Sequence, residues 1–318
     1  AEVSVDEPDR CQRLYTLRSS QPLVDQLPRN PREVSELSDW PVLRSGSLWL
    51  DALYAMSMEE TRENSVSSIQ DDSFNGGQPM DCPAGGCFET GRRWPYVWTR
   101  DTAYAAQLGL GLLDPRRMLN SLEFKLSTPR GGGPLQIVQD TGTGGSYPVS
   151  TDRVVWSMGA RALLPMLEDS ARDDFASNSL EALRSTLEQD RHIAFDEQLG
   201  LYRGEQSFLD WREQSYPAFV AEDPAQIAIS YSLSTNMGHL AALELAAELS
   251  AQNGNNSDAS SYIQQAQQLR VSIEAHFGDD QQGFAGLLPS QLDPVPNRRL
   301  DLLGSAQAIL AGIGTAQQ

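Results

Sequence analysis

Apolar residues recur along most of this chain at intervals of three and four positions, the spacing of an amphipathic helix. Leu50, Leu53 and Tyr54 follow that period within residues 47–65. Patterns of the same kind, bounded by Gly, Pro or polar clusters, predict helices over about 47–65, 100–113, 115–126, 150–167, 177–190, 224–249 and 257–277, and from about 300 onwards. Strand patterns are short and sparse, as in residues 135–138. The sequence therefore predicts an all-α fold.

Long loops and short loops alternate between the predicted helices. The long loops, rich in Gly or aromatic residues, cover 66–98, 129–150, 200–223 and 278–299. Helices that are paired in this way indicate an array of α-hairpins. If the array closes into a ring, the long loops gather at one end and build a single pocket. Residues 1–45 are rich in Pro and charge with weak periodicity, so we expect an irregular lead-in before a helical catalytic domain over 46–318.

The segment from Trp94 to Tyr104 combines aromatic residues with an Arg-Asp pair directly before an apolar helical run. Aromatic faces suit the C–H faces of a sugar ring, and a fixed guanidinium and carboxylate suit its hydroxyl groups. The alternative is an ordinary helix start in which Arg100 and Asp101 form a buried ion pair. A Trp-x-Arg-Asp motif by itself leaves both interpretations open.

From Trp98-Thr99-Arg100-Asp101 onwards, the chain resembles the six-hairpin glycosidases, most closely the glucoamylase and glycogen-debranching (amylo-α-1,6-glucosidase) types. The similar segments follow in the same order over about 260 residues, at 98–101, 150–163, 209–213, 228–243 and 301–305. The resemblance implies an (α/α)6-type toroid of helix hairpins whose long loops form a pocket at one end. It also implies an inverting glycoside hydrolase that removes a terminal, α-linked glucosyl residue from an oligosaccharide.

The resemblance also implies a role for individual residues. Arg100 and Asp101 would hold the terminal sugar by its hydroxyl groups. The general acid would come from the 209–213 segment, where Asp210 matches the debranching pattern and Glu213 the glucoamylase pattern; we favour Asp210 slightly. Other substrate-contacting residues would be Trp94, Trp98, Asp152 and Trp211. A general acid near neutral pH needs a raised pKa, which an aromatic setting favours.

An inverting enzyme also needs a base about 6.5–9.5 Å from the acid, with room for a water molecule. In the family this base lies in the last hairpin, and no segment of this chain resembles that hairpin. The missing hairpins would lie outside the given sequence or on a second chain, or the ring is incomplete. Asp140 and Asp152 are carboxylates in loops expected to face the pocket, and the alternative is that they are solvated-loop and helix-cap residues.

Several alternatives to this function stay open. On the same fold, the chain could be a trehalase-type or mannosidase-type hydrolase, or a phosphorylase. The absent base favours a non-catalytic carbohydrate-binding toroid. A helical-array interaction protein is the plainest alternative, and it predicts no sugar-sized pocket above Trp98. The motifs predict neither a metal nor an organic cofactor, and His192, His239 and His276 are expected to be structural.

The composition excludes other partners. The formal net charge is −19 with one lysine, Lys125, so a nucleic acid or an anionic membrane is not an expected partner. Cys82 and Cys87 flank a short Gly/Pro turn that could close as a disulfide, with a zinc site as the weaker alternative because no further ligand lies nearby. A disulfide would place the protein in the periplasm or outside the cell, with any signal peptide already removed. Cys11 would be left over.

Overall fold

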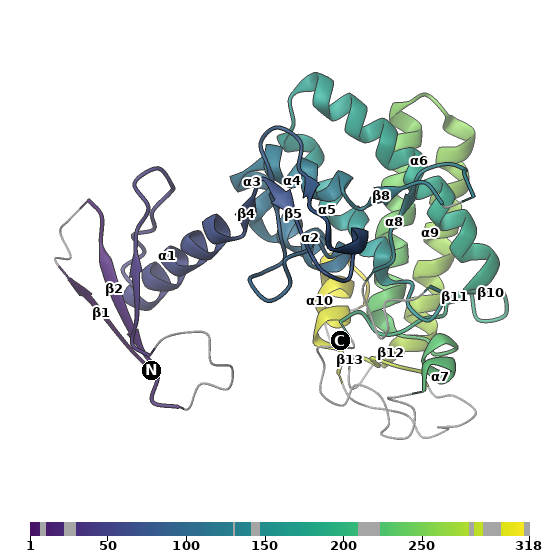
Figure 1. Ribbon diagram of the computed structural model, residues 1–318. Coiled ribbons are helices and arrows are strands. Elements are labelled where there is room, and N and C mark those ends of the chain that lie inside the picture. Colours follow the sequence, from purple (N-terminus) through teal and green to yellow (C-terminus); the bar gives the residue numbers. More distant parts are fainter. Residues whose placement is uncertain are drawn as a thin grey trace. The chain divides into compact units, whose positions relative to one another are not determined.

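The computed structural model describes residues 1–6, 11–21, 30–129, 131–140, 147–208, 223–279, 283–288 and 300–314. The chain divides into two compact units, Ala1–Pro95 and Tyr96–Gln318. The boundary expected near residue 45 falls inside the first of these units. Each unit is described by itself below (Figure 1).

The first unit contains a three-stranded antiparallel sheet and one long helix. The strands are β1 (Glu2–Asp6), β2 (Leu14–Arg18) and β3 (Arg32–Ser35), in that order across the sheet. Helix α1 (Leu48–Glu63) covers it, and Tyr15 and Val34 of the sheet pack with Ala52 and Ala55 of the helix. The prediction of an irregular segment over 1–45 is therefore wrong. These strands are four or five residues long, which is too short for their alternation to stand out among the prolines and charges.

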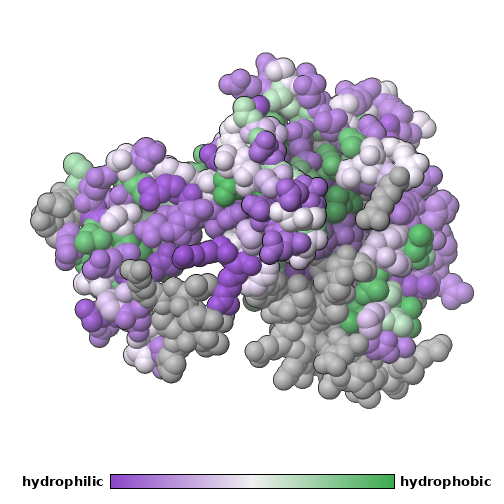
Figure 2. Space-filling model, in the orientation of Figure 1, coloured by the Kyte–Doolittle hydropathy of each residue, from purple (hydrophilic) through white to green (hydrophobic). Residues whose placement is uncertain are grey.

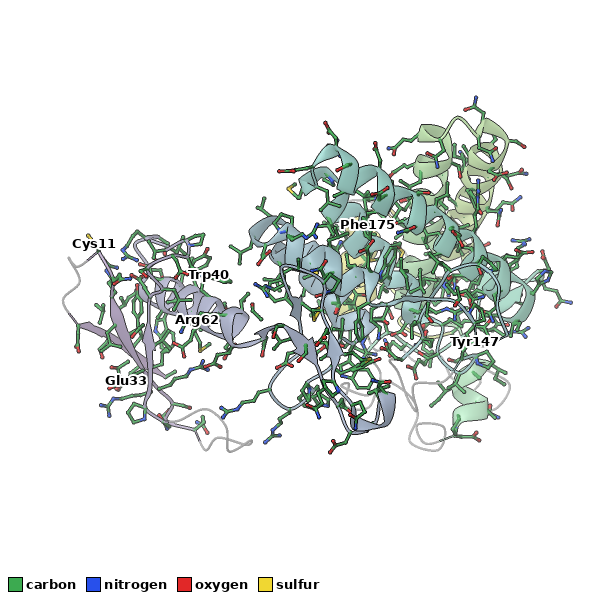
Figure 3. All side chains as sticks on the ribbon, turned by 45° about the horizontal axis from the view of Figure 1, so that its top comes forward. Cys11, Glu33, Trp40, Arg62, Tyr147 and Phe175 are labelled. Atoms are coloured by element: carbon green, nitrogen blue, oxygen red, sulfur yellow. A yellow bond between two sulfur atoms is a disulfide. The ribbon has the colours of Figure 1, made fainter. Side chains whose placement is uncertain are left out.

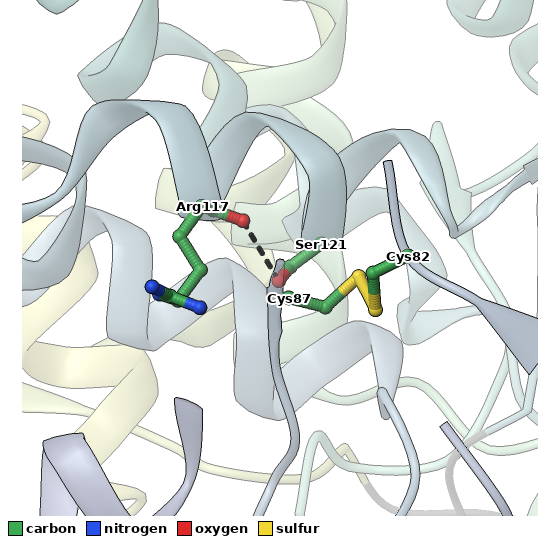
Figure 4. Close-up of a disulfide and its surroundings, with 4 residues drawn as sticks. All are labelled: Cys82, Cys87, Arg117 and Ser121. Carbon is green, nitrogen blue, oxygen red and sulfur yellow. Dashed lines mark hydrogen bonds between the residues drawn. A yellow bond between two sulfur atoms is a disulfide. The ribbon is translucent and has the colours of Figure 1, made fainter. Parts of the chain in front are cut away.

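The rest of the first unit holds short strand pairs where one polar loop was expected. Strand β4 (Ser65–Val66) pairs with β7 (Cys87–Phe88), and β5 (Ser68–Ile69) pairs with β6 (Met80–Asp81), around the short turn η1 (Asn75–Gly77). Cys82 and Cys87 form the predicted disulfide, with their Cα atoms 5.8 Å apart (Figure 4). Cys11, labelled in Figure 3, is an exposed free thiol.

The second unit is mainly helical. Its helical elements are α2 (Thr99–Ala105), the π-helical turn η2 (Ala106–Leu110), α3 (Gly111–Leu113), α4 (Pro115–Glu123), η3 (Asp152–Val155), α5 (Trp156–Leu163), η4 (Leu164–Met166), α6 (Asp169–Ile193), α7 (Pro224–Ala228), α8 (Leu233–Gln252), α9 (Asn256–Phe277) and α10 (Leu302–Leu310). All the predicted helices are present. Two differ in extent, because α6 begins at residue 169 and the helix expected over 224–249 is broken into α7 and α8.

The break before α8 has a physical cause. Leu233 donates its N–H to the carbonyl of Gly286 at 3.0 Å, and Leu288 donates to the carbonyl of Tyr231 at 3.0 Å. Ser232 and Leu287 also form an isolated bridge. The backbone of 231–233 thus bonds to a distant segment rather than along a helix, and no local pattern in the sequence announces such a pairing.

Small two-stranded sheets follow three of the helices. They are β8 (Leu126–Ser127) with β9 (Gln136–Ile137) after α4, β10 (Phe195–Asp196) with β11 (Leu201–Tyr202) after α6, and β12 (Gly278–Asp279) with β13 (Gly283–Phe284) after α9. If α2–α3 and η3–η4 are each counted as one helical segment and the short α7 is left out, the unit repeats a pattern of two helices followed by a β-hairpin, although its sequence does not repeat. The fold is mainly helical with small sheets, which agrees with the predicted helical class.

Four helices, α2, α5, α8 and α10, pack against one another in chain order, while α4, α6 and α9 pack beside them. Figure 1 shows α8 and α9 side by side with α6 next to them. Gly159 and Gly304 allow close approach between the packed helices. A Cβ at Gly159 would lie 2.8 Å from the carbonyl oxygen of Ala103, and one at Gly304 would lie 3.0 Å from the nitrogen of Ser234. Phe175, labelled in Figure 3, is fully buried against Trp156.

The surface drawn in Figure 2 is mostly hydrophilic, in keeping with the 21% of charged residues. Within the described parts of the chain, no helix combines the length and the apolarity that a membrane crossing needs.

Candidate functional site

The starts of four helices meet at one polar cluster in the second unit. Arg100 near the start of α2 bonds to Asp152 at the start of η3. The N–H of Ser207 donates to Ser234 Oγ at the start of α8, at 3.1 Å. Gly304, near the start of α10, lies against Ser234. Segments spread over about 200 residues of sequence thus converge here. We call Arg100, Ser150, Asp152, Glu205 and Ser207 the helix-start cluster.

Arg100 lies at the centre of this cluster with its side chain 1% exposed. Its Nη1 is 3.4 Å from Asp152 Oδ2, and its guanidinium lies 4.0 Å from the centre of the Phe208 ring. A charge at such depth needs both a counter-ion and hydrogen bonds. A buried ion pair, expected as the alternative interpretation, is present, and it joins Arg100 to Asp152. Asp101 is half-buried in the first turn of α2.

Asp152 accepts hydrogen bonds from three further side chains. Gln139 Nε2 donates to its Oδ1 at 3.0 Å, Ser150 Oγ at 3.0 Å, and Ser207 Oγ donates to its Oδ2 at 3.3 Å. Ser150 Oγ also lies 2.8 Å from Glu205 Oε1. Asp152 and Glu205 are both fully buried, so one serine hydroxyl joins two buried carboxyl groups.

Phe208 closes the described part of the cluster on one side. It stacks on Tyr104 with ring centres 5.4 Å apart, and its φ of 61° lies in the left-handed region that non-glycine residues rarely adopt. Such strain at a bulky residue often accompanies a functional site. The Tyr104 hydroxyl accepts from Gln307 Nε2 at 2.7 Å, and burial raises the pKa of the Tyr104 phenol. Phe208 therefore lies against the Arg100 guanidinium and is itself stacked on Tyr104.

The aromatic residues before α2 form the adjoining wall. Trp98 is half-buried, and its ring meets the edge of Tyr96 with centres 5.6 Å apart. Thr99 donates its N–H to Asp140 Oδ1 at 3.1 Å and its hydroxyl to the same oxygen at 2.7 Å. Asp140 also pairs with the buried ammonium of Lys125. Asp140 therefore caps a helix, which was the alternative role considered for it.

A second buried charge network lies beside the cluster. Asp190 pairs with Arg153 at 2.7 Å and with His239 Nε2 at 3.2 Å, and all three side chains are nearly or fully buried. His239 Nδ1 faces the carbonyl of Thr235 at 2.9 Å, and its ring stacks on Tyr202 at 3.9 Å. Tyr147, labelled in Figure 3, lies over the Arg153 guanidinium at 4.3 Å. His239 therefore has a structural environment, as its sequence context suggested.

The other predicted site residues fall into two groups. Trp94 belongs to the first unit, where it bridges to Gly91 and is 40% exposed. Asp210, Trp211 and Glu213 lie outside the described residues, directly after Phe208. The prediction that these residues supply the acid and a wall of the pocket stays a prediction.

The sequence alone did not single out Glu205, Ser207 or Gln139. Glu205 is one acidic residue in a stretch of small and polar residues, 203–207, and nothing in that pattern indicates that its side chain is fully buried. The one available signal was position, since the stretch directly precedes the acidic-aromatic segment at 209–213.

A hollow of about 440 Å³ is lined mainly by residues of α5, α8 and α10. Its described lining is mainly apolar, with Arg161 and Glu244 paired to each other at 3.4 Å, and includes no aromatic ring. A sugar site needs stacking surfaces and hydroxyl partners. The helix-start end, with Trp98, Tyr104 and Phe208, fits that requirement better than the hollow does.

Within the described ranges, no group of three His, Cys, Asp or Glu side chains is arranged to hold a metal ion. No protein-family model matches this chain, and no curated protein matches it.

Proposed function

We propose that the second unit is a glycoside hydrolase that removes a terminal, α-linked glucosyl residue from an oligosaccharide with inversion. One observation carries the proposal. The segments singled out by the sequence resemblance, 98–101, 150–163, 228–243 and 301–305, all contribute to or adjoin the helix-start cluster. Chance similarity of short motifs gives no reason for them to meet in space.

The same proposal extends to the architecture. The α-hairpins of the second unit would curve into an (α/α) toroid, with α2, α5, α8 and α10 as inner helices. The three repeats of two helices and a β-hairpin support this arrangement. In such a toroid the starts of the inner helices lie at one end, which is where the cluster lies.

In the proposed mechanism, aromatic rings and carboxylates bind the sugar and transfer protons, and other buried groups hold them in position. Trp98 would stack on the terminal sugar, and Asp101 would accept from its hydroxyl groups. Asp210, or Glu213 in the alternative alignment, would protonate the glycosidic oxygen while a base activates a water molecule that attacks the anomeric carbon. Because Arg100 is almost fully buried, we propose that it supports the residues around the sugar rather than contacting the sugar itself.

Substitution of the two acid candidates tests this function. Asp210→Asn and Glu213→Gln change charge with little change in shape, and each is assayed on α-linked di- and oligosaccharides. The acid variant should lose at least about 100-fold in turnover, the low end of general acid catalysis. Glu197→Gln, in an exposed ion pair with Arg191, is the matched control and should keep full activity. Full activity in both Asp210→Asn and Glu213→Gln would overturn the assignment.

A second candidate is carbohydrate binding without hydrolysis. It is favoured by one observation, namely that Asp140 and Asp152, the carboxylates considered as facing the pocket, are buried in ion pairs. Titration calorimetry with maltose and longer glucans, followed by product analysis after long incubation, separates the two functions. Binding with no released sugar would select this candidate over the hydrolase.

We also propose that the protein acts outside the cytoplasm, because a disulfide such as Cys82–Cys87 forms and persists under oxidising conditions. The proposed partners are an oligosaccharide and a second chain that carries further hairpins.

A further inference from the structure

Two adjacent residues, Gln139 and Asp140, bond to the starts of two different helices. Asp140 Oδ1 accepts from the N–H and the hydroxyl of Thr99, the first residue of α2. Gln139 Nε2 donates to Asp152 Oδ1 at 3.0 Å, and Gln139 Oε1 accepts from the N–H of Arg153 at 3.0 Å. Both ends of the Gln139 carboxamide therefore bond to η3. The dipeptide thus ties α2 to η3.

The dipeptide is itself held firmly. Val138, which precedes it, donates its N–H to the carbonyl of Lys125 at 2.9 Å, and its carbonyl oxygen lies 2.8 Å from Thr99 Oγ1. Ile137 donates to Thr186 Oγ1 of α6 at 3.0 Å. The β8–β9 hairpin and α6 therefore hold Gln139 and Asp140 in place. The two residues can in turn fix the positions of both helix starts.

Lys125 adds a charge that an ordinary helix cap does not need. It is the one lysine of the chain, it is 1% exposed, and it pairs with Asp140. Its ammonium lies 4.6 Å from the centre of the Tyr96 ring, two residues before Trp98. Burial lowers the pKa of Lys125 and is costly to the ammonium, which the carboxylate and the ring face offset. The Lys125–Asp140 pair therefore contacts the segment 96–99 at both of its ends, Tyr96 and Thr99.

We propose that Gln139 and Asp140 are positioning residues that lock the start of α2 against the start of η3, and so fix Trp98 relative to the Arg100–Asp152 pair. The role of Trp98 as a sugar platform rests on the proposed function, whereas the lock itself does not. Neither residue would touch the reacting atoms; both would act through the two helix starts.

Residue-resolved hydrogen exchange tests the lock without any substrate. Gln139→Ala removes the direct partner of the Arg153 amide, so faster exchange there is expected under any account. The lock predicts that the Thr99 amide, which bonds to Asp140 and not to Gln139, also exchanges about tenfold faster, the factor that loss of one ordinary hydrogen bond allows. A purely local role for Gln139 leaves the Thr99 amide unchanged, and that result would overturn the proposal.

Matched controls exist in the same unit. The amides of Arg117 and Gly304 bond to the capping carboxylates of Asp114 and Asp301, and neither should change in Gln139→Ala. Gln198→Ala, at an exposed glutamine, should change neither Thr99 nor Arg153. If Gln139→Ala fails to fold, Thr99→Val serves as the reciprocal test. It removes one hydroxyl, and the lock predicts faster exchange at Arg153, while unchanged exchange there would refute it.

Kinetics then connect the lock to function. In an active enzyme, Gln139→Ala should raise the KM for a maltooligosaccharide at least about tenfold with a smaller effect on kcat, because the sugar platform moves while the acid does not. If the wild-type chain neither binds nor cleaves glucans, the proposed function fails, and the exchange at Thr99 still decides whether the lock exists. If glucans are cleaved and KM is unchanged in Gln139→Ala, the functional role of the lock is refuted.

Discussion

The Arg100–Asp152 pair is expected to be a major contributor to the stability of the second unit. Asp152→Asn keeps the size of the side chain and removes its charge, so the buried Arg100 guanidinium loses its ion pair with Asp152. Removing one partner of a buried ion pair costs about 3–5 kcal/mol. The Nη1–Oδ2 distance of 3.4 Å is longer than the roughly 2.7–2.9 Å of a strong charged hydrogen bond, so we expect a value of about 3 kcal/mol.

The hydrogen-bond partners of Asp152 support this magnitude. An asparagine side chain has one oxygen, so it cannot accept from Gln139, Ser150 and Ser207 as the carboxylate does on both of its oxygens. Arg100→Met combined with Asp152→Asn removes both charges and should cost less than the sum of the single changes, because the buried guanidinium is removed together with the carboxylate that it pairs with.

Urea unfolding monitored by hydrogen exchange of α5 amides measures these differences in the second unit specifically. Glu197→Gln is the control, because its partner Arg191 and Glu197 itself are 37% and 75% exposed, and such pairs contribute about 0–1 kcal/mol. If Asp152→Asn costs no more than Glu197→Gln, the account of the cluster as a buried, paired charge network is refuted.

Three further predictions follow from the second unit. Gly159→Ala should destabilise the folded state by about 1–3 kcal/mol, because the added Cβ would lie 2.9 Å from the Ala103 Cα. At the control position Gly131, an added Cβ meets no atom within 4 Å, so Gly131→Ala should change the melting temperature little. Equal effects of the two substitutions would contradict the close packing of α2 on α5. The hydrogen bond from the Tyr231 hydroxyl, helped by one from Arg203, holds the pKa of Asp196 below its usual range, although burial alone would raise it. The stabilisation from Asp196 is therefore present above about pH 4 and is lost as the pH falls further. Asp196→Asn should therefore lower the unfolding midpoint at pH 7 and differ less from wild type near pH 2, and a constant difference would refute this linkage. Turnover of maltooligosaccharides should not depend on inorganic phosphate, and strict dependence would select a phosphorylase instead.

Helical periodicity was sufficient to predict the main elements of the fold, because each amphipathic helix buries a face that its own sequence displays. Strands β1–β3 were missed since four or five residues give too few alternations to detect. The break before α8 was missed for a different reason. It depends on backbone bonds between 231–233 and 286–288, about 55 residues away, and local sequence carries no signal for such a pairing.

The site was predicted in its segments but not in its contacts. The motif singled out Arg100, but it did not predict that Arg100 pairs with Asp152, 52 residues away. A residue pattern indicates which groups are unusual, but only the packing of α2 against η3 decides which carboxylate faces the guanidinium. For the same reason Glu205, isolated in sequence, joins the cluster through Ser150.

The anomeric form of the first sugar released tests the central claim most directly. Proton NMR during hydrolysis of an α-linked maltooligosaccharide by the wild-type chain distinguishes the two anomers before they interconvert. The account predicts β-glucose as the initial product, because water attacks from the face opposite the leaving group. Release of α-glucose, or of no sugar at all, would contradict it.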